Sequence, residues 1–168
     1  MSDEVEIGRG KRGRRAYTLD DIALVPSRRT RDPEDVNVGW QIDAYHVDTP
    51  LMAAPMDSVM SPETAIAFGR LGGIGVLDLD GLWTRYEDPT PILDHIAHLG
   101  EEESIATLQR VYSEPIKPSL ITARLKQLRE AGVVVAGKLS PQRVQKHWRA
   151  VVDAGVDLLI IRGSTVSA

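Results

Sequence analysis

The stretch from Ala131 to Ile161, AGVVVAGKLSPQRVQKHWRAVVDAGVDLLII, decides the fold class of this 168-residue chain. It contains an apolar run (133–139), a Ser-Pro helix start, a helical stretch (141–154), a glycine stop and a second apolar run (157–161). The apolar side chains of the helical stretch recur on one face, at Val144, Trp148, Val151 and Val152. A strand followed by a capped helix and another strand is typical of a parallel α/β fold.

The same unit occurs earlier in the chain. The nearly all-apolar run 50–56, PLMAAPM, predicts a parallel strand buried on both faces. Ser61-Pro62-Glu63 predicts the start of a helix that ends at Gly72, and residues 74–77 predict the next strand. The other expected helices are 92–99, 102–112 and 119–131.

Residues 1–16 have the character of a basic flexible arm, and 36–42 with 44–47 predict a hairpin ahead of the main fold. Periodicity does not separate an open doubly wound sheet from a closed barrel, because both use the same unit. The chain stops in the loop after its fourth expected strand, whereas a (β/α)8 barrel needs about 250 residues. We therefore expect residues 17–168 to be the truncated N-terminal half of a (β/α)8 TIM barrel.

The composition limits the class of protein. Hydrophobic residues make up 42% and charged residues 26%, which is ordinary for a globular domain. No apolar run approaches the roughly 20 residues of a membrane span, and the acidic N-terminus lacks the apolar region of a secretory signal. We therefore expect a cytoplasmic protein with no membrane partner. The chain has no cysteine, which excludes disulfides, thiolate metal sites and a cysteine nucleophile within these residues.

The formal net charge of −4 conceals a basic N-terminal segment. Such a cluster attracts phosphates, but a solvated arm or a subunit contact explains it equally simply. Gly8 to Gly13, GRGKRG, satisfies G-x-G-x-x-G without the preceding strand and following helix of a dinucleotide site. No aromatic residues alternate with the basic ones, so we expect no nucleic-acid partner. The basic residues are Arg9, Lys11, Arg12, Arg14, Arg15, Arg28, Arg29 and Arg31.

Ligands of parallel α/β folds meet the carboxyl ends of the strands, which identifies the candidate site residues. Asp57, Ser58 and Ser140 have an alternative role as helix caps, and loop aspartates such as Asp78 and Asp80 are usually solvated. His95 and His98 lie three apart but have no third ligand at useful spacing, so we expect no metal site. The candidates are Met56, Asp57, Ser58, Asp78, Asp80, Lys138, Ser140, Arg162, Ser164 and Thr165.

Three stretches together resemble the IMP dehydrogenase / GMP reductase family. They are 17–26 (YTLDDIALVP), 50–59 (PLMAAPMDSV) and 65–77 (AIAFGRLGGIGVL), and a weaker similarity continues through 131–136 and 150–161. Within the second stretch, the proline at position 55 is closer to the dehydrogenase form, because the reductase form tends to have asparagine there.

The resemblance implies a (β/α)8 barrel that assembles as a homo-oligomer, usually a tetramer. It implies a purine nucleoside monophosphate as substrate, NAD or NADP as cofactor, and a monovalent cation bound outside these residues. The catalytic cysteine of the family would lie beyond Ala168. The residues implied in substrate binding are Ala54, Met56 and Asp57. The residues implied in cofactor binding are Arg162, Ser164 and Thr165.

Two departures from the family pattern narrow the resemblance. Residues 78–118 are too few for the pair of CBS domains that the family usually inserts after the second strand. Ile161-Arg162-Gly163-Ser164 stands where the family commonly has an aspartate that contacts the cofactor. The pattern resembles a CBS-lacking branch related to IMP dehydrogenase, and we expect this 168-residue chain to be inactive by itself. The resemblance leads us to expect a piece of an oxidoreductase that converts IMP to XMP with NAD in guanine nucleotide biosynthesis. The alternatives are a GMP reductase, which converts GMP to IMP with NADPH, and a non-catalytic nucleotide-binding protein.

Overall fold

The computed structural model describes residues 4–6, 9–15, 17–23, 25 and 32–163. The chain divides into two compact units, residues 1–37 and residues 38–168. The division that the sequence predicts, at residues 16 and 17, stays a prediction.

The first unit contains an antiparallel pair of strands, β1 (Glu4–Glu6) and β2 (Arg12–Arg14), in which Glu4 pairs with Arg14. The predicted basic flexible arm therefore contains a short strand pair, and its flexibility stays a prediction. The strands carry opposite charges, and facing charges of opposite sign stabilise such a pair modestly. Two short 3-10 turns follow, η1 (Leu19–Asp21) and η2 (Pro33–Asp35).

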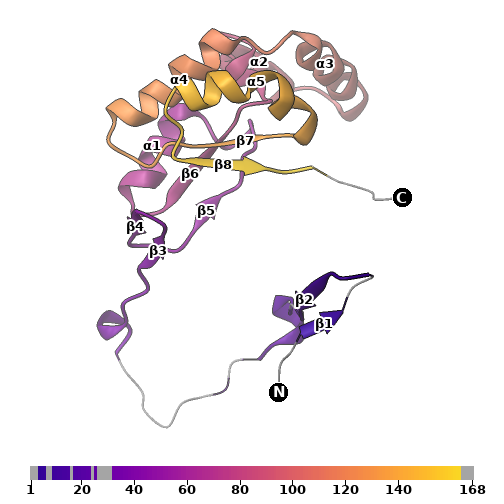
Figure 1. Ribbon diagram of the computed structural model, residues 1–168. Helices are drawn as coiled ribbons and strands as arrows, with labels where there is room; N and C mark the ends of the chain where they lie inside the picture. The colour runs from indigo at the N-terminus through magenta and orange to yellow at the C-terminus, as the bar shows by residue number, and fades with distance from the viewer. Residues whose placement is uncertain (1–3, 7–8, 16, 24, 26–31, 164–168) are drawn as a thin grey trace. The chain divides into compact units, whose positions relative to one another are not determined.

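The second unit contains a four-stranded parallel sheet in the order β5 (Met52–Ala53), β6 (Ile74–Asp78), β7 (Ala136–Leu139) and β8 (Leu158–Ile161) (Figure 1). Strands that follow one another in sequence also lie next to one another in the sheet. That order is typical of a barrel, whereas doubly wound sheets reverse direction at a switch point. Closure into a barrel stays a prediction. The predicted hairpin is confirmed as β3 (Trp40–Ile42) paired antiparallel with β4 (Tyr45–Val47).

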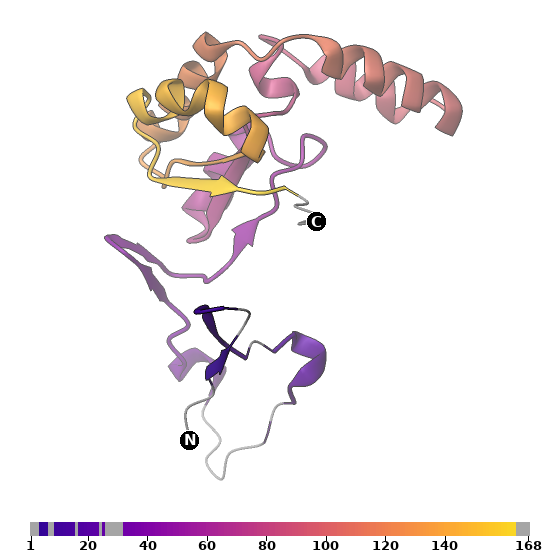
Figure 2. The same cartoon turned by 45° about the vertical axis from the view of Figure 1, so that its right-hand side comes forward.

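Three helices lie on the same side of this sheet, α1 (Pro62–Arg70), α4 (Pro118–Glu130) and α5 (Pro141–Asp153) (Figures 1 and 2). Each begins with proline in its first turn, where the missing N–H costs nothing. The predicted Ser61 cap is confirmed, since its hydroxyl accepts from the Thr64 amide at 3.1 Å, whereas the Ser140 side chain makes no capping bond. Glycines with φ of +72° and +76° follow α4 and α5, at Gly132 and Gly155.

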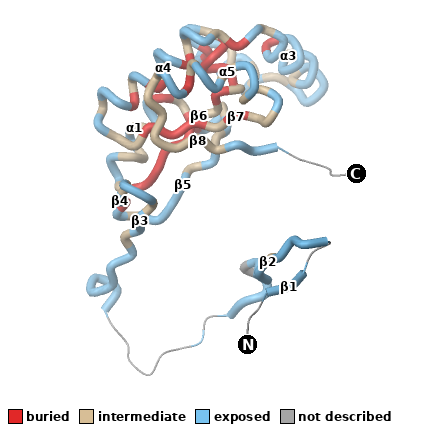
Figure 3. Tube along the Cα trace, viewed as in Figure 1, coloured by how far each residue is buried: buried red, intermediate tan, exposed pale blue. Residues whose placement is uncertain are grey.

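Buried apolar residues of the second unit form two clusters. Figure 3 shows the buried segments in the sheet and in the helices that lie on it. Alternate residues of a strand point to opposite faces, so Leu77 of β6 joins the cluster beneath the helices while Ile74 and Val76 join the other. The helices contribute Ile121, Leu125, Leu128 and Val151 to the first cluster, and β4 contributes Val47 to the second. Burial on both faces, as expected of parallel strands, is confirmed for β6.

Strand β5 differs from the prediction. Only two residues of the expected 50–56 form a ladder, and Leu51 and Met52 are 57% and 41% exposed. Strand β5 pairs with β6 alone, and the prolines at 50 and 55 have no N–H to donate to a ladder. The apolar run 50–56 therefore predicts the position of a strand, but its predicted burial on both faces is wrong.

The chain between β6 and α4 forms η3 (Leu82–Thr84), α2 (Thr90–Ala97) and α3 (Glu101–Ser113), close to the predicted helices 92–99 and 102–112. Turn η3 is buried, whereas no residue of α2 is buried, and α3 extends away from the sheet (Figure 2). Within the described ranges, no helix is long and apolar enough to cross a membrane.

Candidate functional site at the carboxyl ends of the strands

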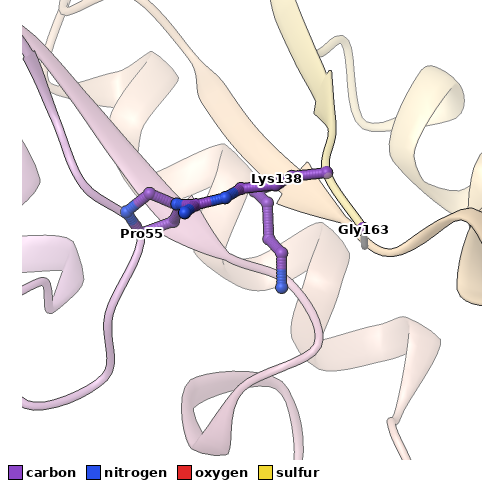
Figure 4. Close-up of a pocket in the computed structure, with 4 residues that line it drawn as sticks. Pro55, Lys138 and Gly163 are labelled. Atoms are coloured by element: carbon purple, nitrogen blue, oxygen red, sulfur yellow. The ribbon is translucent and has the colours of Figure 1, made fainter. Parts of the chain in front are cut away.

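The loops that follow β5 and β8 meet the end of β7 around a cavity of about 460 Å³. Its lining residues are Pro55, Lys138, Arg162 and Gly163. Figure 4 shows Lys138 between the loop that carries Pro55 and the chain at Gly163. This is the edge of the sheet at which the sequence predicts a site.

Lys138 is the centre of a buried charge cluster. The parallel register pairs it with Asp78, and its Nζ lies 3.3 Å from both carboxylate oxygens of Asp78 and 3.2 Å from Oδ2 of Asp80. The three side chains are only 15–17% exposed. The expectation that Asp78 and Asp80 are solvated is wrong, because the β6–β7 pairing places both carboxylates beside a buried ammonium group.

This cluster holds two carboxylates against one ammonium group. Burial raises the pKa of Asp78, and the Asp80 amide and the Lys138 charge offset this only in part, while the negative charge of Asp57 adds to it. Asp80 Oδ2 accepts from the Ser140 amide at 2.7 Å, but Oδ1 of the same carboxylate is buried with no hydrogen-bond partner in the described structure. The cluster therefore carries excess negative charge at the strand ends.

Asp57 holds the β5–α1 loop in place. Its Oδ2 accepts from the Leu82 amide at 2.8 Å and from the Tyr112 hydroxyl at 2.5 Å, so the loop is tied to η3 and α3. A Cβ at Gly81 would collide with this carboxylate, so any other residue there would have to displace it. The alternative role of Asp57 as a helix cap is wrong, because Ser61 caps α1. Burial, followed by the hydrogen bond to Asp57, raises the pKa of Tyr112.

The predicted substrate residues lie on this loop. Met56 is 50% exposed, and it lines a second cavity, of about 440 Å³, together with Asp57 and Asp78. Ala54 is exposed on the same loop but lines neither cavity. The other walls of the second cavity come from η3, α2 and α3 through Leu82, Leu93, Ile96, Leu108 and Tyr112.

The predicted cofactor residues are only partly described. Arg162 is exposed and lines the first cavity, where no carboxylate lies within 4 Å of it among the described residues. Ser164 and Thr165 lie outside the described residues. In the part of the chain that the structure describes, no three His, Asp or Glu side chains form a group that could hold a metal ion.

Sequence reasoning missed the role of Tyr112 and the Asp78–Lys138 pair. Tyr112 reads as part of the apolar stripe of a helix, and nothing in the sequence relates it to Asp57, 55 positions away. The Asp78–Lys138 pair had a usable signal, since both residues follow apolar runs that a parallel sheet would align. A test of register between the two strands would have predicted this ion pair.

Comparison with known proteins identifies the family. The sequence model of the IMP dehydrogenase / GMP reductase domain matches residues 16–167. The chain belongs to the IMP dehydrogenase / GMP reductase family. A solved IMP dehydrogenase/GMP reductase-like protein of Corynebacterium glutamicum superposes on this family member with a TM-score of 0.81 at 42% identity, covering 98% of the chain and 46% of that protein.

Relatives of this family member extend beyond it. An uncharacterized oxidoreductase of Mycolicibacterium smegmatis is 43% identical over 169 residues, which cover 98% of the chain and 45% of the relative. An inosine-5'-monophosphate dehydrogenase of Methanocaldococcus jannaschii is 41% identical over 64 residues, which are 38% of the chain and 13% of that enzyme. The chain thus spans less than half the length of these relatives.

Proposed function

We propose that this chain is the nucleotide-binding part of an oxidoreductase that converts IMP to XMP with NAD. The observation that carries the proposal is the placement of the β5–α1 loop at the carboxyl edge of the sheet. Met56 is half-exposed beside the cavity there, and Asp57 anchors the loop through Leu82 and Tyr112. A rigid loop with an exposed apolar side chain suits a flat purine base, which a mobile loop would hold less well.

The residues at the first cavity fit an anionic dinucleotide. Arg162 is exposed there without a carboxylate partner in the described structure, and guanidinium groups bind phosphate oxygens in a bidentate manner. A bound nicotinamide would supply the hydride acceptor. We propose that Arg162, with Ser164 and Thr165 on the following segment, holds the phosphates of this cofactor, and that Met56 and Ala54 contact the purine.

The chain's own residues would position and insulate the reacting groups. The Asp78–Lys138–Asp80 cluster fixes the floor of the site, and its excess negative charge favours a substrate edge that donates hydrogen bonds. The resemblance implies a cysteine nucleophile, which the 168 residues do not contain. We also expect the whole protein to act as a homo-oligomer and to bind a monovalent cation elsewhere.

A GMP reductase that uses NADPH is the second candidate. Arg162 favours it, because it stands where the family commonly has a cofactor-contacting aspartate and because arginine suits the additional phosphate of NADP. A protein that binds the nucleotide without turnover is the third candidate.

Assays of the purified gene product separate these candidates. IMP with NAD should produce NADH, and Met56→Ala should raise the KM for IMP about tenfold, because it removes an apolar contact of roughly 1–2 kcal/mol. Leu71→Ala is the matched control, since Leu71 is 76% exposed and lies at the opposite end of α1 from the loop. Turnover of GMP with NADPH in place of IMP with NAD would select the reductase. Nucleotide binding without either turnover would select the third candidate.

A further inference from the structure

A third cavity, of about 450 Å³, lies outside the strand-end site. It is bounded by the end of α3, the segment 114–116 that follows it, and the first half of α5. Four of its lining residues are basic, namely Arg85, Arg143, Lys146 and His147. Its volume is within the range of ordinary ligand sites, about 300–1,000 Å³.

Arg85 is a buried cation without a carboxylate partner. It is 5% exposed, and its guanidinium donates to the backbone oxygens of Asp80, at 2.9 and 3.1 Å, and of Glu114. The ring of Tyr112 lies 5.5 Å away. Arginine stays charged in proteins, and a buried charge that lacks a counterion is costly. Backbone carbonyls compensate it only partly, so an anion in the cavity would complete the compensation.

The cations from α5 are likewise uncompensated. No carboxylate lies within 4 Å of Arg143 or Lys146 in the described parts of the chain. The one acidic lining residue, Glu114, already pairs with Lys117 at 3.2 Å. Among the described residues, none of the four basic side chains that line the cavity has a carboxylate within 4 Å, so the cavity wall carries more positive than negative charge.

His147 points to the same conclusion by a different observation. Its Nδ1 is buried and has no hydrogen-bond partner among the described residues. Burial lowers the pKa of His147, and so do the charges of Arg143, Lys146 and Arg85, whereas Asp80 opposes them. A buried imidazole nitrogen that can donate a hydrogen bond, close to three cations, suits an anionic ligand.

We propose that this basic cavity is a second anion site, which binds a phosphate group through Arg85, Arg143, Lys146 and His147. Guanidinium and ammonium groups that converge from two elements suit the tetrahedral oxygens of phosphate. The cavity has room for more than the ion, so either free phosphate or a phosphate monoester fits it. The four basic residues line neither cavity of the proposed nucleotide site, although Tyr112 lies in the walls of both this cavity and the second one. The two proposals rest on different charged side chains, and different variants test them.

The test measures binding of inorganic phosphate and of ribose 5-phosphate to the full chain by calorimetry, with the imidazole signals of His147 followed by NMR. We expect both probes to bind and to raise the pKa of His147. Tighter binding of the ester would indicate that the cavity also holds an organic group, and equal binding would indicate that the ion alone is recognised. Failure of both probes to bind would overturn the proposal.

Variants locate the bound ion. Arg143→Gln combined with Lys146→Gln should weaken phosphate binding at least tenfold and abolish the His147 response. Arg149→Gln removes a charge from the same helix at a residue outside the cavity lining, and should leave both unchanged. Buried Arg85 is left intact because its replacement could disturb folding. Loss of binding in Arg162→Gln but not in the double variant would place the ion at the strand-end site and contradict the proposal.

Discussion

The two ends of the parallel sheet each hold a partly buried carboxylate, and different groups compensate the two charges. At the amino end, Asp157 accepts hydrogen bonds at 2.8 Å from the Val135 amide, the Arg129 guanidinium and the Tyr45 hydroxyl. At the carboxyl end, Asp78 receives the Asp80 amide at 2.9 Å and a 3.3 Å contact with Lys138, which Asp80 shares. Asp157 therefore accepts three hydrogen bonds from groups of its own, whereas Asp78 shares Lys138 with Asp80.

The pKa values of the two aspartates move in opposite directions. Burial alone would raise both, but at Asp157 the hydrogen bonds from Val135, Arg129 and Tyr45 outweigh it and lower the pKa. At Asp78 burial prevails and the pKa is raised. The opposite directions indicate that the ionised Asp157 stabilises the fold at the amino end, whereas Asp78 holds its charge at a cost at the carboxyl end, where ligands of parallel α/β folds bind.

The largest expected effect comes from removing the shared cation. Lys138→Met leaves two buried carboxylates without a counterion, and it should lower the free energy of unfolding by about 3 kcal/mol at neutral pH. Denaturant titration measures the change. Lys126→Met is the control, because Lys126 pairs with Glu130 on the exposed face of α4 and contributes little. Equal losses of unfolding free energy in the two variants would show that the two carboxylates do not depend on Lys138.

Exchanging each aspartate for asparagine tests the comparison itself. Asp157→Asn should cost about 2 kcal/mol, because three charge-assisted hydrogen bonds are weakened. Asp78→Asn should cost under about 1 kcal/mol or be stabilising, since it removes a charge that burial disfavours. The ratio of the two losses is measured by denaturant titration, and the reverse order would refute the assignment of the two ends.

The pH dependence of the same variants gives the sign of each contribution. The folded-state pKa of Asp157 is lowered, so its stabilisation is complete above the unfolded value of 3.8 and is lost as the pH falls through the folded pKa. The folded-state pKa of Asp78 is raised, so its cost is complete above that pKa, shrinks as the pH falls below it and is gone below the unfolded value of 3.8. Asp157→Asn should therefore flatten the acid loss of stability, and Asp78→Asn should steepen it.

A smaller effect is expected at the β5–α1 loop. Tyr112→Phe removes the hydroxyl that donates to Asp57, and it should cost about 1 kcal/mol and speed hydrogen exchange of residues 54–60. Tyr86→Phe removes a comparable hydroxyl, which donates to the Val111 carbonyl at 3.1 Å, and should leave exchange of that loop unchanged. Unchanged exchange in Tyr112→Phe would mean that the loop is held by Leu82 alone.

The sequence predicted most of the helices and strands because the signals that start and end them are local. Helix starts such as Ser61-Pro62 and stops such as Gly132 and Gly155 depend on adjacent residues, and the structure confirms them. The exposure of β5 follows from its pairing with β6 alone, which cannot be read from the apolar run 50–56. The location of the candidate site at the carboxyl ends of the strands was predicted, but its contacts were not. These contacts join residues far apart in sequence, such as Asp57 with Tyr112 and Asp78 with Lys138. Such contacts follow from tertiary packing and strand register.

The most direct test of the account titrates IMP into the purified gene product and follows methyl signals by NMR at the two ends of the sheet. If the carboxyl edge binds the nucleotide, IMP should shift the methyl signals of Met56 and Ala54, beside the carboxyl ends, and leave those of Val47 and Val135 at the amino end unchanged. Shifts confined to the amino end, or none at saturating IMP, would contradict the claim that the carboxyl edge binds the nucleotide.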